Sequence, residues 1–190
     1  EAYWRRWVEL FTGILKAAPN AAHRAVAELC NAGHVATVIT QNVDGLHQAS
    51  GVAENSVIEL HGNTRRIRCM HCSRQVPTDE VWGRLARGDA APACACGGLL
   101  KPDTVSFGQA MPEDKMARSM AHAAECDLCL VLGSSLVVYP AAAIPLHAAD
   151  SGARLMIVNR ESTPLDSRAD LVVHDSVGRV LGAILERIRG

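Results

Sequence analysis

A dense group of polar side chains follows a short apolar segment near residue 40. Residues 35–39 have the β-branched composition of a strand. Gln41, Asn42 and Asp44 come next, and Gly45 gives the backbone access to a left-handed turn. In open α/β sheets, ligands bind just beyond the carboxyl ends of the strands. The pattern therefore predicts a binding site at this loop, although such side chains can also serve only their own backbone.

A histidine suited to general-base chemistry lies in a second motif, ELHGN, at residues 59–63. A neutral imidazole can accept a proton near pH 7, which makes His61 a candidate catalytic base. The chain has eight histidines, and any single one of them is more often structural, so spacing alone favours a structural role for His61.

Four cysteines have the spacing of a metal site. Cys69 and Cys72 form a C-x-x-C pair, and Cys94 and Cys96 form a C-x-C pair that is separated from the first by 21 residues. Two thiolate pairs can supply the four tetrahedral ligands of structural zinc, at about 2.3 Å from the metal. Such a site has no open position, so the metal would stabilise the fold rather than react. His71 is an alternative ligand, and free or oxidised cysteines are the other interpretation.

The remaining cysteines are expected to be small buried side chains. Cys126 and Cys129 also have C-x-x-C spacing, but residues three apart on a strand point to opposite faces. Together with Cys30, they are predicted to belong to the core.

A series of motifs in fixed order resembles the sirtuin family, the NAD-dependent protein lysine deacylases. The motifs are PNAAHRAVAEL (19–29), TQNVDGLHQASG (40–51), ELHGN (59–63), the cysteine pairs, LLKPDTVSFGQ (99–109), VLGSSLVVYPAA (131–142) and IVNRES (157–162). Together they extend over nearly the whole chain. The resemblance implies an enzyme that removes acyl groups from protein lysines and yields nicotinamide and O-acyl-ADP-ribose. It also implies NAD as co-substrate and one structural zinc ion.

The resemblance also implies roles for individual residues. His61 would activate a ribose hydroxyl of NAD after the substrate's acyl oxygen has displaced nicotinamide. An acyl-lysine peptide would add as a strand along an edge of the protein. The implied cofactor-binding positions are Gln41, Asn42, Asp44, Gly133, Ser134, Ser135, Asn159, Arg160, Glu161 and Val177, and the implied substrate-binding positions are Val105, Phe107, Gly108 and Val137. Phe107 as a core residue and Arg160 as a solvated charge are the competing interpretations.

Three features depart from the family pattern. The second cysteine pair is separated by one residue rather than two, and Gln109 stands where the family usually has an acid. The glycine-rich phosphate loop that precedes these motifs in sirtuins is absent from the 190 residues, which we expect to be part of a longer protein or a natural truncation. A catalytically silent module that binds ADP-ribose or an acylated peptide is therefore the alternative function. Within the enzyme class, mono-ADP-ribosyl transfer is also compatible with the same activated sugar.

Composition narrows the class of partner. The net charge of −1 gives no global field toward nucleic acid or an anionic membrane, and we expect neither as a direct partner. Arginines around the first cysteine pair suggest a zinc-ribbon nucleic-acid binder, but the interleaved aromatic residues of such binders are missing. No apolar run approaches the roughly 20 residues of a membrane helix. Seven cysteines with two tight pairs fit a reducing, cytoplasmic setting.

The order of elements predicts an α/β fold. Apolar strands alternate with amphipathic helices, which is typical of a doubly wound, parallel, Rossmann-like sheet. We expect this NAD-binding domain to comprise residues 1–64 and 101–190, without its first strand, and residues 65–100 to form a small inserted zinc-binding module. Helices are predicted over 1–17, 21–31, 113–124 and 177–188, with a weaker helical pattern at 79–87, and strands over 35–40, 57–60, 128–132, 154–158 and 171–173.

Overall fold

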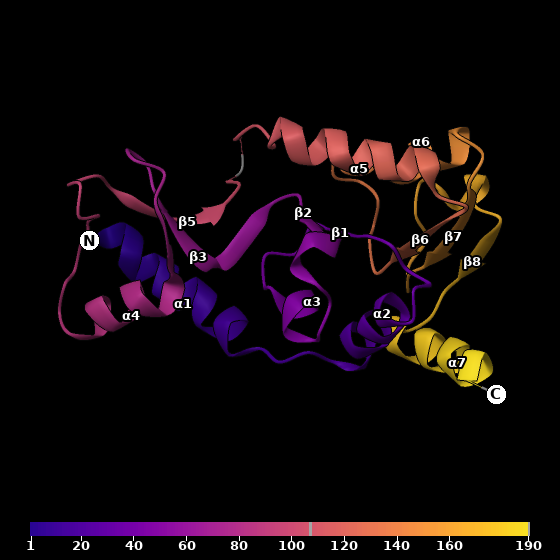
Figure 1. The fold of residues 1–190 in the computed structure, drawn as a ribbon, viewed down its shortest axis with the longest axis horizontal. Helices are drawn as coiled ribbons and strands as arrows, with labels where there is room; N and C mark the ends of the chain where they lie inside the picture. Colours follow the sequence, from indigo (N-terminus) through magenta and orange to yellow (C-terminus); the bar gives the residue numbers. More distant parts are fainter. Residues whose placement is uncertain (107, 190) are drawn as a thin grey trace. The chain divides into compact units, whose positions relative to one another are not determined.

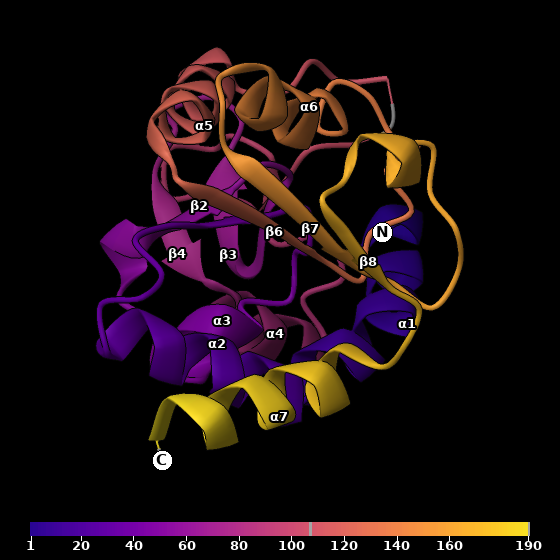
Figure 2. The ribbon, with the colours of Figure 1, turned by 90° about the vertical axis from the view of Figure 1, so that its right-hand side faces the viewer.

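A computed structural model describes residues 1–106 and 108–189 of the chain, which separates into two compact units. The first unit contains Glu1–Ala18, Gln41–Leu46 and His61–Ala110. The second unit contains the remaining segments, Pro19–Thr40, His47–Leu60 and Met111–Gly190. Figure 1 labels the helices and most strands of both units, and Figure 2 labels β4 (Gln75–Pro77).

Five short parallel strands form the framework of the second unit. β1 (Val38–Thr40) pairs with β2 (Val57–Glu59) in one sheet. In a second sheet, β6 (Leu128–Leu132) pairs with β7 (Arg154–Val158), which pairs in turn with β8 (Leu171–Val173). Apolar β-branched and leucine residues dominate these strands, as is typical of parallel strands covered on both faces.

Helices cover both faces of the β6–β7–β8 sheet (Figure 2). On one face lie α2 (Ala21–Asn31) and α7 (Val177–Arg189), which pack against each other. On the other face lie α5 (Glu113–Glu125) and α6 (Ala143–Asp150). This arrangement is doubly wound, as the alternation of elements predicts. Three short pieces complete the unit's connections: α3 (Leu46–Ala49) and the 3₁₀ turns Glu54–Ser56 and Asp166–Arg168.

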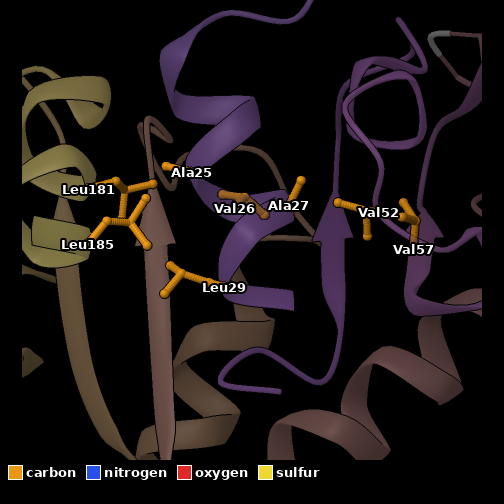
Figure 3. Packing of buried hydrophobic residues seen from close by; sticks show 8 residues of the cluster. All are labelled: Ala25, Val26, Ala27, Leu29, Val52, Val57, Leu181 and Leu185. Carbon is orange, nitrogen blue, oxygen red and sulfur yellow. The ribbon is translucent and has the colours of Figure 1, made fainter. Parts of the chain in front are cut away.

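Each helical layer buries its own apolar cluster against the strands. In Figure 3, leucines and small side chains of α2 and α7 meet valines from the β1–β2 region. The cluster on the opposite face includes Ile58, Ala123 and Ile144. Val38 of β1 and Leu130 of β6 pack against the first cluster, so both strands contribute to one core. The first cluster consists of Ala25, Val26, Ala27, Leu29, Val52, Val57, Leu181 and Leu185.

The first unit is built on a small antiparallel sheet. Its order is β4 (Gln75–Pro77), β3 (Gly62–Cys69) and β5 (Leu100–Thr104). Two helices pack against β3, namely α1 (Ala2–Lys16) and α4 (Thr78–Ala86). The buried residues of this unit's core are Trp4, Trp7, Ile67, Cys69, Val81 and Leu100.

The aromatic residues of α1 form the centre of this core. The ring of Trp7 lies 5.4 Å from that of Trp4 and 5.7 Å from that of Trp82, between ring centroids. Phe11 stacks on Trp7 at 5.6 Å. Offset and edge-to-face pairs of this kind add to the free energy gained from burying the rings.

The predicted helices agree with the structure, whereas three strands were not predicted. The helix over 21–31 and the strands over 128–132, 154–158 and 171–173 have the observed bounds. The sequence does not predict β3, because arginines interrupt its apolar alternation. Its partners β4 and β5 were not predicted either. The predicted module limits, 65–100, fall within the first unit, and that division of the chain stays a prediction. Across the described residues, every helix is too short or too polar to cross a bilayer.

Replacement of Leu181 tests the core of the second unit. Leu181 has 0% exposure between α2 and α7, so Leu181→Ala should lower the free energy of unfolding by about 2–5 kcal/mol through lost burial and a residual cavity. Urea unfolding measures the change. Ile188→Ala on the same helix is the control, because Ile188 is 48% exposed and its truncation should cost far less. Equal losses in the two variants would contradict this packing.

Candidate active site and metal centre

The four cysteines predicted as metal ligands converge in the first unit. Their sulfur atoms all lie within 4.8 Å of one another. The Sγ atoms of Cys69 and Cys96 are 3.6 Å apart, and those of Cys72 and Cys94 are 3.7 Å apart. These separations match the edge of a tetrahedron with zinc–sulfur bonds of about 2.3 Å, and they are far longer than a disulfide bond of about 2.05 Å. The predicted clustering of the four thiols is confirmed, with no need for His71 as a ligand.

Glycine at position 98 leaves room for this arrangement. A Cβ atom on Gly98 would lie 2.6 Å from the Cβ of His71 and 2.8 Å from the Sγ of Cys69. Any side chain would therefore displace a ligand. The unusual C-x-C pair is compatible with chelation because the backbone turns back at Gly97 and Gly98, where the Gly98 carbonyl accepts a hydrogen bond from the Cys94 amide. The residues present fit a closed structural zinc site.

Backbone amides favour the thiolate form of the first ligand. The N–H groups of Cys72 and His71 donate to the sulfur of Cys69 at 3.5 and 3.4 Å, and the pKa of Cys69 falls to about 6. At Cys96 the Gly98 amide acts in the same direction, but hydrogen bonding with the neighbouring sulfurs of Cys72 and Cys69 prevails and raises the pKa to about 12. A divalent cation would replace these sulfur–sulfur hydrogen bonds, because it stabilises all four cysteines as thiolates together.

The other three cysteines pack against the apolar clusters, although they are partly buried and not fully buried as predicted. Burial raises the pKa of the Cys30 thiol, and it raises the pKa of Cys129 to about 11. Cys126 packs against the same apolar cluster as Cys129, and burial raises its pKa as well. The thiol form therefore predominates at neutral pH, in agreement with the predicted core role.

His61 directly precedes β3, and its ring is oriented by the backbone. The Nδ1 atom is 3.1 Å from the carbonyl oxygen of Gln41. A carbonyl oxygen can only accept, so Nδ1 carries the proton and Nε2 of the neutral ring is left with its lone pair. The His61 carbonyl in turn accepts a hydrogen bond from the Val105 amide at 2.9 Å. This geometry gives His61 the tautomer that a general base at Nε2 requires.

A glycine follows His61 for a steric reason. Gly62 has φ of +80°, and a Cβ atom there would lie 2.0 Å from the carbonyl oxygen of Asp103 on β5. Only glycine permits so close an approach of two backbone segments.

The polar loop after β1 belongs to the same unit as His61. The Oδ1 atom of Asp44 accepts a hydrogen bond from the Leu46 amide at 2.9 Å, in an Asx-type turn that precedes the short helix α3. One carboxylate oxygen of Asp44 is therefore bonded to the loop's own backbone, which is the alternative role considered for these polar side chains. Gln41 is half-buried and Asn42 is exposed. The structure thus brings Gln41, Asn42, Asp44 and His61 together within one unit.

The second unit contains a cavity of about 430 Å³ at the carboxyl ends of its strands. The amino-terminal ends of α2 and α7 border it, where free backbone N–H groups and the helix dipoles favour an anionic group. Gly133, Asn159, Arg160 and Val177, four of the predicted cofactor positions, line the cavity. Lining residues that were not predicted are Asn20, Ala21, Ala22, Asp175, Ser176 and Gly178.

The sequence signal for these additional residues is helix capping. Asn20 accepts a hydrogen bond from the His23 amide at 3.1 Å and so caps α2. Ser176 directly precedes α7. A search for capping residues at the starts of predicted helices would have found both.

The comparisons with known proteins decide the family. The sequence profile of the Sir2 family matches residues 1–140. A Rhodopseudomonas palustris NAD-dependent protein deacetylase is 48% identical over 180 residues, which cover 94% of this chain and 71% of that protein. The chain belongs to the Sir2 family. NAD-dependent protein deacetylase 1 of Bradyrhizobium diazoefficiens is similarly close to this sirtuin, at 49% identity over 94% of the chain and 70% of the relative.

Solved structures give the same result and confirm the Rossmann-like fold class. A structure of Sir2 with a p53 peptide and NAD+ has a TM-score of 0.89 and 37% identity, and the match covers 97% of this sirtuin and 77% of that chain. A complex of Sir2 with the inhibitor EX-527, 2'-O-acetyl-ADP-ribose and a deacetylated p53 peptide has a TM-score of 0.87 at 37% identity. That match covers 99% of this sirtuin and 80% of the other chain.

The remaining predicted positions of this sirtuin have varied surroundings. Ser134 accepts a hydrogen bond from the Leu136 amide at 3.3 Å, whereas Ser135 and Glu161 are exposed. Val137 is 61% exposed in the second unit. In the first unit, Val105 is half-buried and Gly108 is exposed with φ of +79°, while Phe107 lies outside the described residues. Ser134, Ser135 and Glu161 are not among the residues that line the cavity.

The glycine beside the cysteines provides a test of the metal centre. Gly98→Ala should lose bound zinc, because its Cβ would displace the Cys69 sulfur, whereas the unaltered protein should hold one zinc per chain. Elemental analysis of the purified protein measures the ratio. Gly13→Ala in α1 is the control, since no atom lies within 4 Å of a Cβ at that position. Full zinc content in Gly98→Ala would contradict the proposal that the zinc is held by the four thiols in this geometry.

Proposed function

We propose that this chain removes acyl groups from lysine side chains of proteins, with NAD as co-substrate, and releases nicotinamide and O-acyl-ADP-ribose. The observation that carries the proposal is the His61 ring, whose Nδ1–H faces the Gln41 carbonyl and whose Nε2 is left as a base. Membership of the Sir2 family supports it, since the relatives are named NAD-dependent protein deacetylases.

The residues of the first unit are proposed to act on the reacting sugar. NAD supplies a ribose with nicotinamide as its leaving group. His61 would take a proton from a hydroxyl of that ribose at Nε2, while the Gln41 carbonyl stabilises the charge that the ring acquires. Gln41 and Asn42 would bind the nicotinamide amide and the ribose through their side-chain amides, and Asp44 would orient them.

The cavity of the second unit is proposed to bind the adenosine and phosphate part of the co-substrate. Its volume of about 430 Å³ lies in the usual range for a small-molecule site. The amino termini of α2 and α7 favour phosphate, and Asn159 and Arg160 of the cavity wall would contact the ribose together with Glu161, which lies next to them in sequence. Val177 would lie against the adenine, and Gly133, Ser134 and Ser135 would contribute small or hydroxyl side chains at the end of β6.

The acyl-lysine peptide is proposed to bind by strand addition at positions Val105, Phe107, Gly108 and Val137. Solved Sir2 structures with acetylated peptides support this class of substrate. We further propose a reducing, cytoplasmic setting, because none of the seven cysteines forms a disulfide and four of them are placed as metal ligands. Neither nucleic acid nor a membrane is proposed as a direct partner, in view of the net charge of −1.

A second candidate function is a silent module that binds ADP-ribose without turnover. The observation that favours it is the cavity itself, because its lining residues all belong to the second unit and do not include His61. Binding and catalysis can therefore be measured separately.

Replacement of His61 tests the enzymatic proposal. His61→Ala should reduce formation of nicotinamide and O-acetyl-ADP-ribose from NAD and an acetyl-lysine peptide at least about 100-fold, since it removes the general base. Mass spectrometry follows both products. His34→Ala is the matched control, because His34 is exposed before β1, and it should keep full activity. Undiminished turnover in His61→Ala would refute the assigned role.

Replacement of Asn159 tests the cavity. Asn159→Ala removes a side chain whose Nδ2 donates to the Glu161 carbonyl at 2.8 Å at the cavity wall. We expect ADP-ribose to bind about threefold to tenfold more weakly in calorimetry. Asn31→Ala, at the exposed end of α2, should bind like the unaltered protein. The silent-module alternative requires tight binding of ADP-ribose together with no product in the assay above.

A further inference from the structure

The loop that carries Gln41, Asn42 and Asp44 is attached at several positions to β3 and to His61, the residue before β3. The Gln41 carbonyl contacts the His61 ring at 3.1 Å. Two residues further along, the Val43 carbonyl contacts Thr64. The attachment lies wholly within the first unit, which also contains the four cysteines.

Thr64 is the centre of this attachment. Its side chain has 0% exposure, and both its amide and its hydroxyl donate to the Val43 carbonyl at 2.7 Å. Two donors on one carbonyl fix the oxygen in two directions. The Thr64 hydroxyl is buried in a low-dielectric interior, so its hydrogen bond holds the Val43 carbonyl firmly. Loss of the hydroxyl would leave this carbonyl with one hydrogen-bond donor instead of two.

Thr78 extends the chain of hydrogen bonds to α4. Its hydroxyl donates to the Thr64 carbonyl at 2.5 Å, and its side chain is 2% exposed. Thr78 opens α4, yet no side chain caps that helix, so this hydroxyl serves β3 rather than its own helix. Val81 of α4 and the zinc-site residue Cys69 belong to the same buried cluster. The metal-bearing part of the unit is thereby linked to the loop through Thr78, Thr64 and Val43.

Arg65 holds the next residue of the loop. Its Nε donates to the Asp44 carbonyl at 2.9 Å. Its side chain also packs closely against Gly45, where a Cβ atom would lie 3.0 Å from the Cδ of Arg65 and 3.0 Å from the Nδ2 of Asn63. Gly45 has φ of +68°, so the loop turns at this point in a conformation that other residues resist.

We infer that Thr64 and Thr78 are positioning residues: their buried hydroxyls transmit the folded state of the zinc-binding part to the loop that holds Gln41, Asn42 and Asp44. The inference rests on the proposed function for its effect on catalysis. Its structural part concerns only the order of the loop, and so it can be measured without turnover.

The experiment compares isosteric and conservative variants of both threonines. Thr64→Val and Thr78→Val remove a hydroxyl at nearly constant volume, whereas Thr64→Ser and Thr78→Ser retain it. Thr12→Val is the matched control, because the Thr12 hydroxyl donates to the Val8 carbonyl within α1 of the same unit. Hydrogen–deuterium exchange of residues 41–46 is read by mass spectrometry on zinc-loaded protein, with zinc content measured in each sample.

The valine variants should exchange faster over 41–46 while they retain one zinc per chain, and kcat/KM for NAD should fall roughly tenfold to a hundredfold. The serine variants and Thr12→Val should behave like the unaltered protein. Should Thr64→Val fail to retain zinc, Thr78→Val decides, because it leaves both Thr64 contacts with Val43 in place. Unchanged exchange over 41–46 in zinc-loaded Thr78→Val would overturn the inference. Absence of product from the unaltered protein would instead reject the proposed function and leave the exchange result standing.

Discussion

One hydrogen bond, from the His61 imidazole to the Gln41 carbonyl, sets the chemistry available to the first unit. It fixes the tautomer and the plane of the ring at once, since the carbonyl can only accept. The surrounding structure supports that bond from both sides. The loop is attached to β3 through Val43 and Asp44, and Gly62 lets β5 pass directly behind the histidine. The direction of the His61 ring is thereby set by a backbone carbonyl.

The metal centre and the hydrophobic core of the first unit are one structure rather than two. Cys69 is 1% exposed and lies in the cluster with Trp4, Trp7 and Ile67, while its sulfur faces the other three thiols. Zinc bound by the four thiolates would crosslink β3 to the segment around Cys94 and Cys96 and so add to the stability of this core. The second unit buries two apolar layers around its parallel strands.

Sequence reasoning succeeded where a pattern has a single physical cause. Apolar periodicity gave the bounds of α2 and β7, and paired cysteines predicted the thiol cluster. It failed where tertiary context decides. β3 forms because its backbone pairs on both sides, a fact that its arginines conceal, and the tautomer of His61 depends on a carbonyl 20 residues away. The cavity at the starts of α2 and α7 was only half predicted, because Asn20 and Ser176 mark helix starts rather than any particular ligand.

The aromatic cluster on α1 has an optical consequence. The chain has three tryptophans, Trp4, Trp7 and Trp82, and all of them lie in the first unit. Tryptophan fluorescence, excited selectively at the red edge where tyrosine does not absorb, therefore reports on that unit and not on the helices and strands of the second. Recorded beside circular dichroism, which samples both, it separates melting of the zinc-bearing part from melting of the parallel sheet without any label.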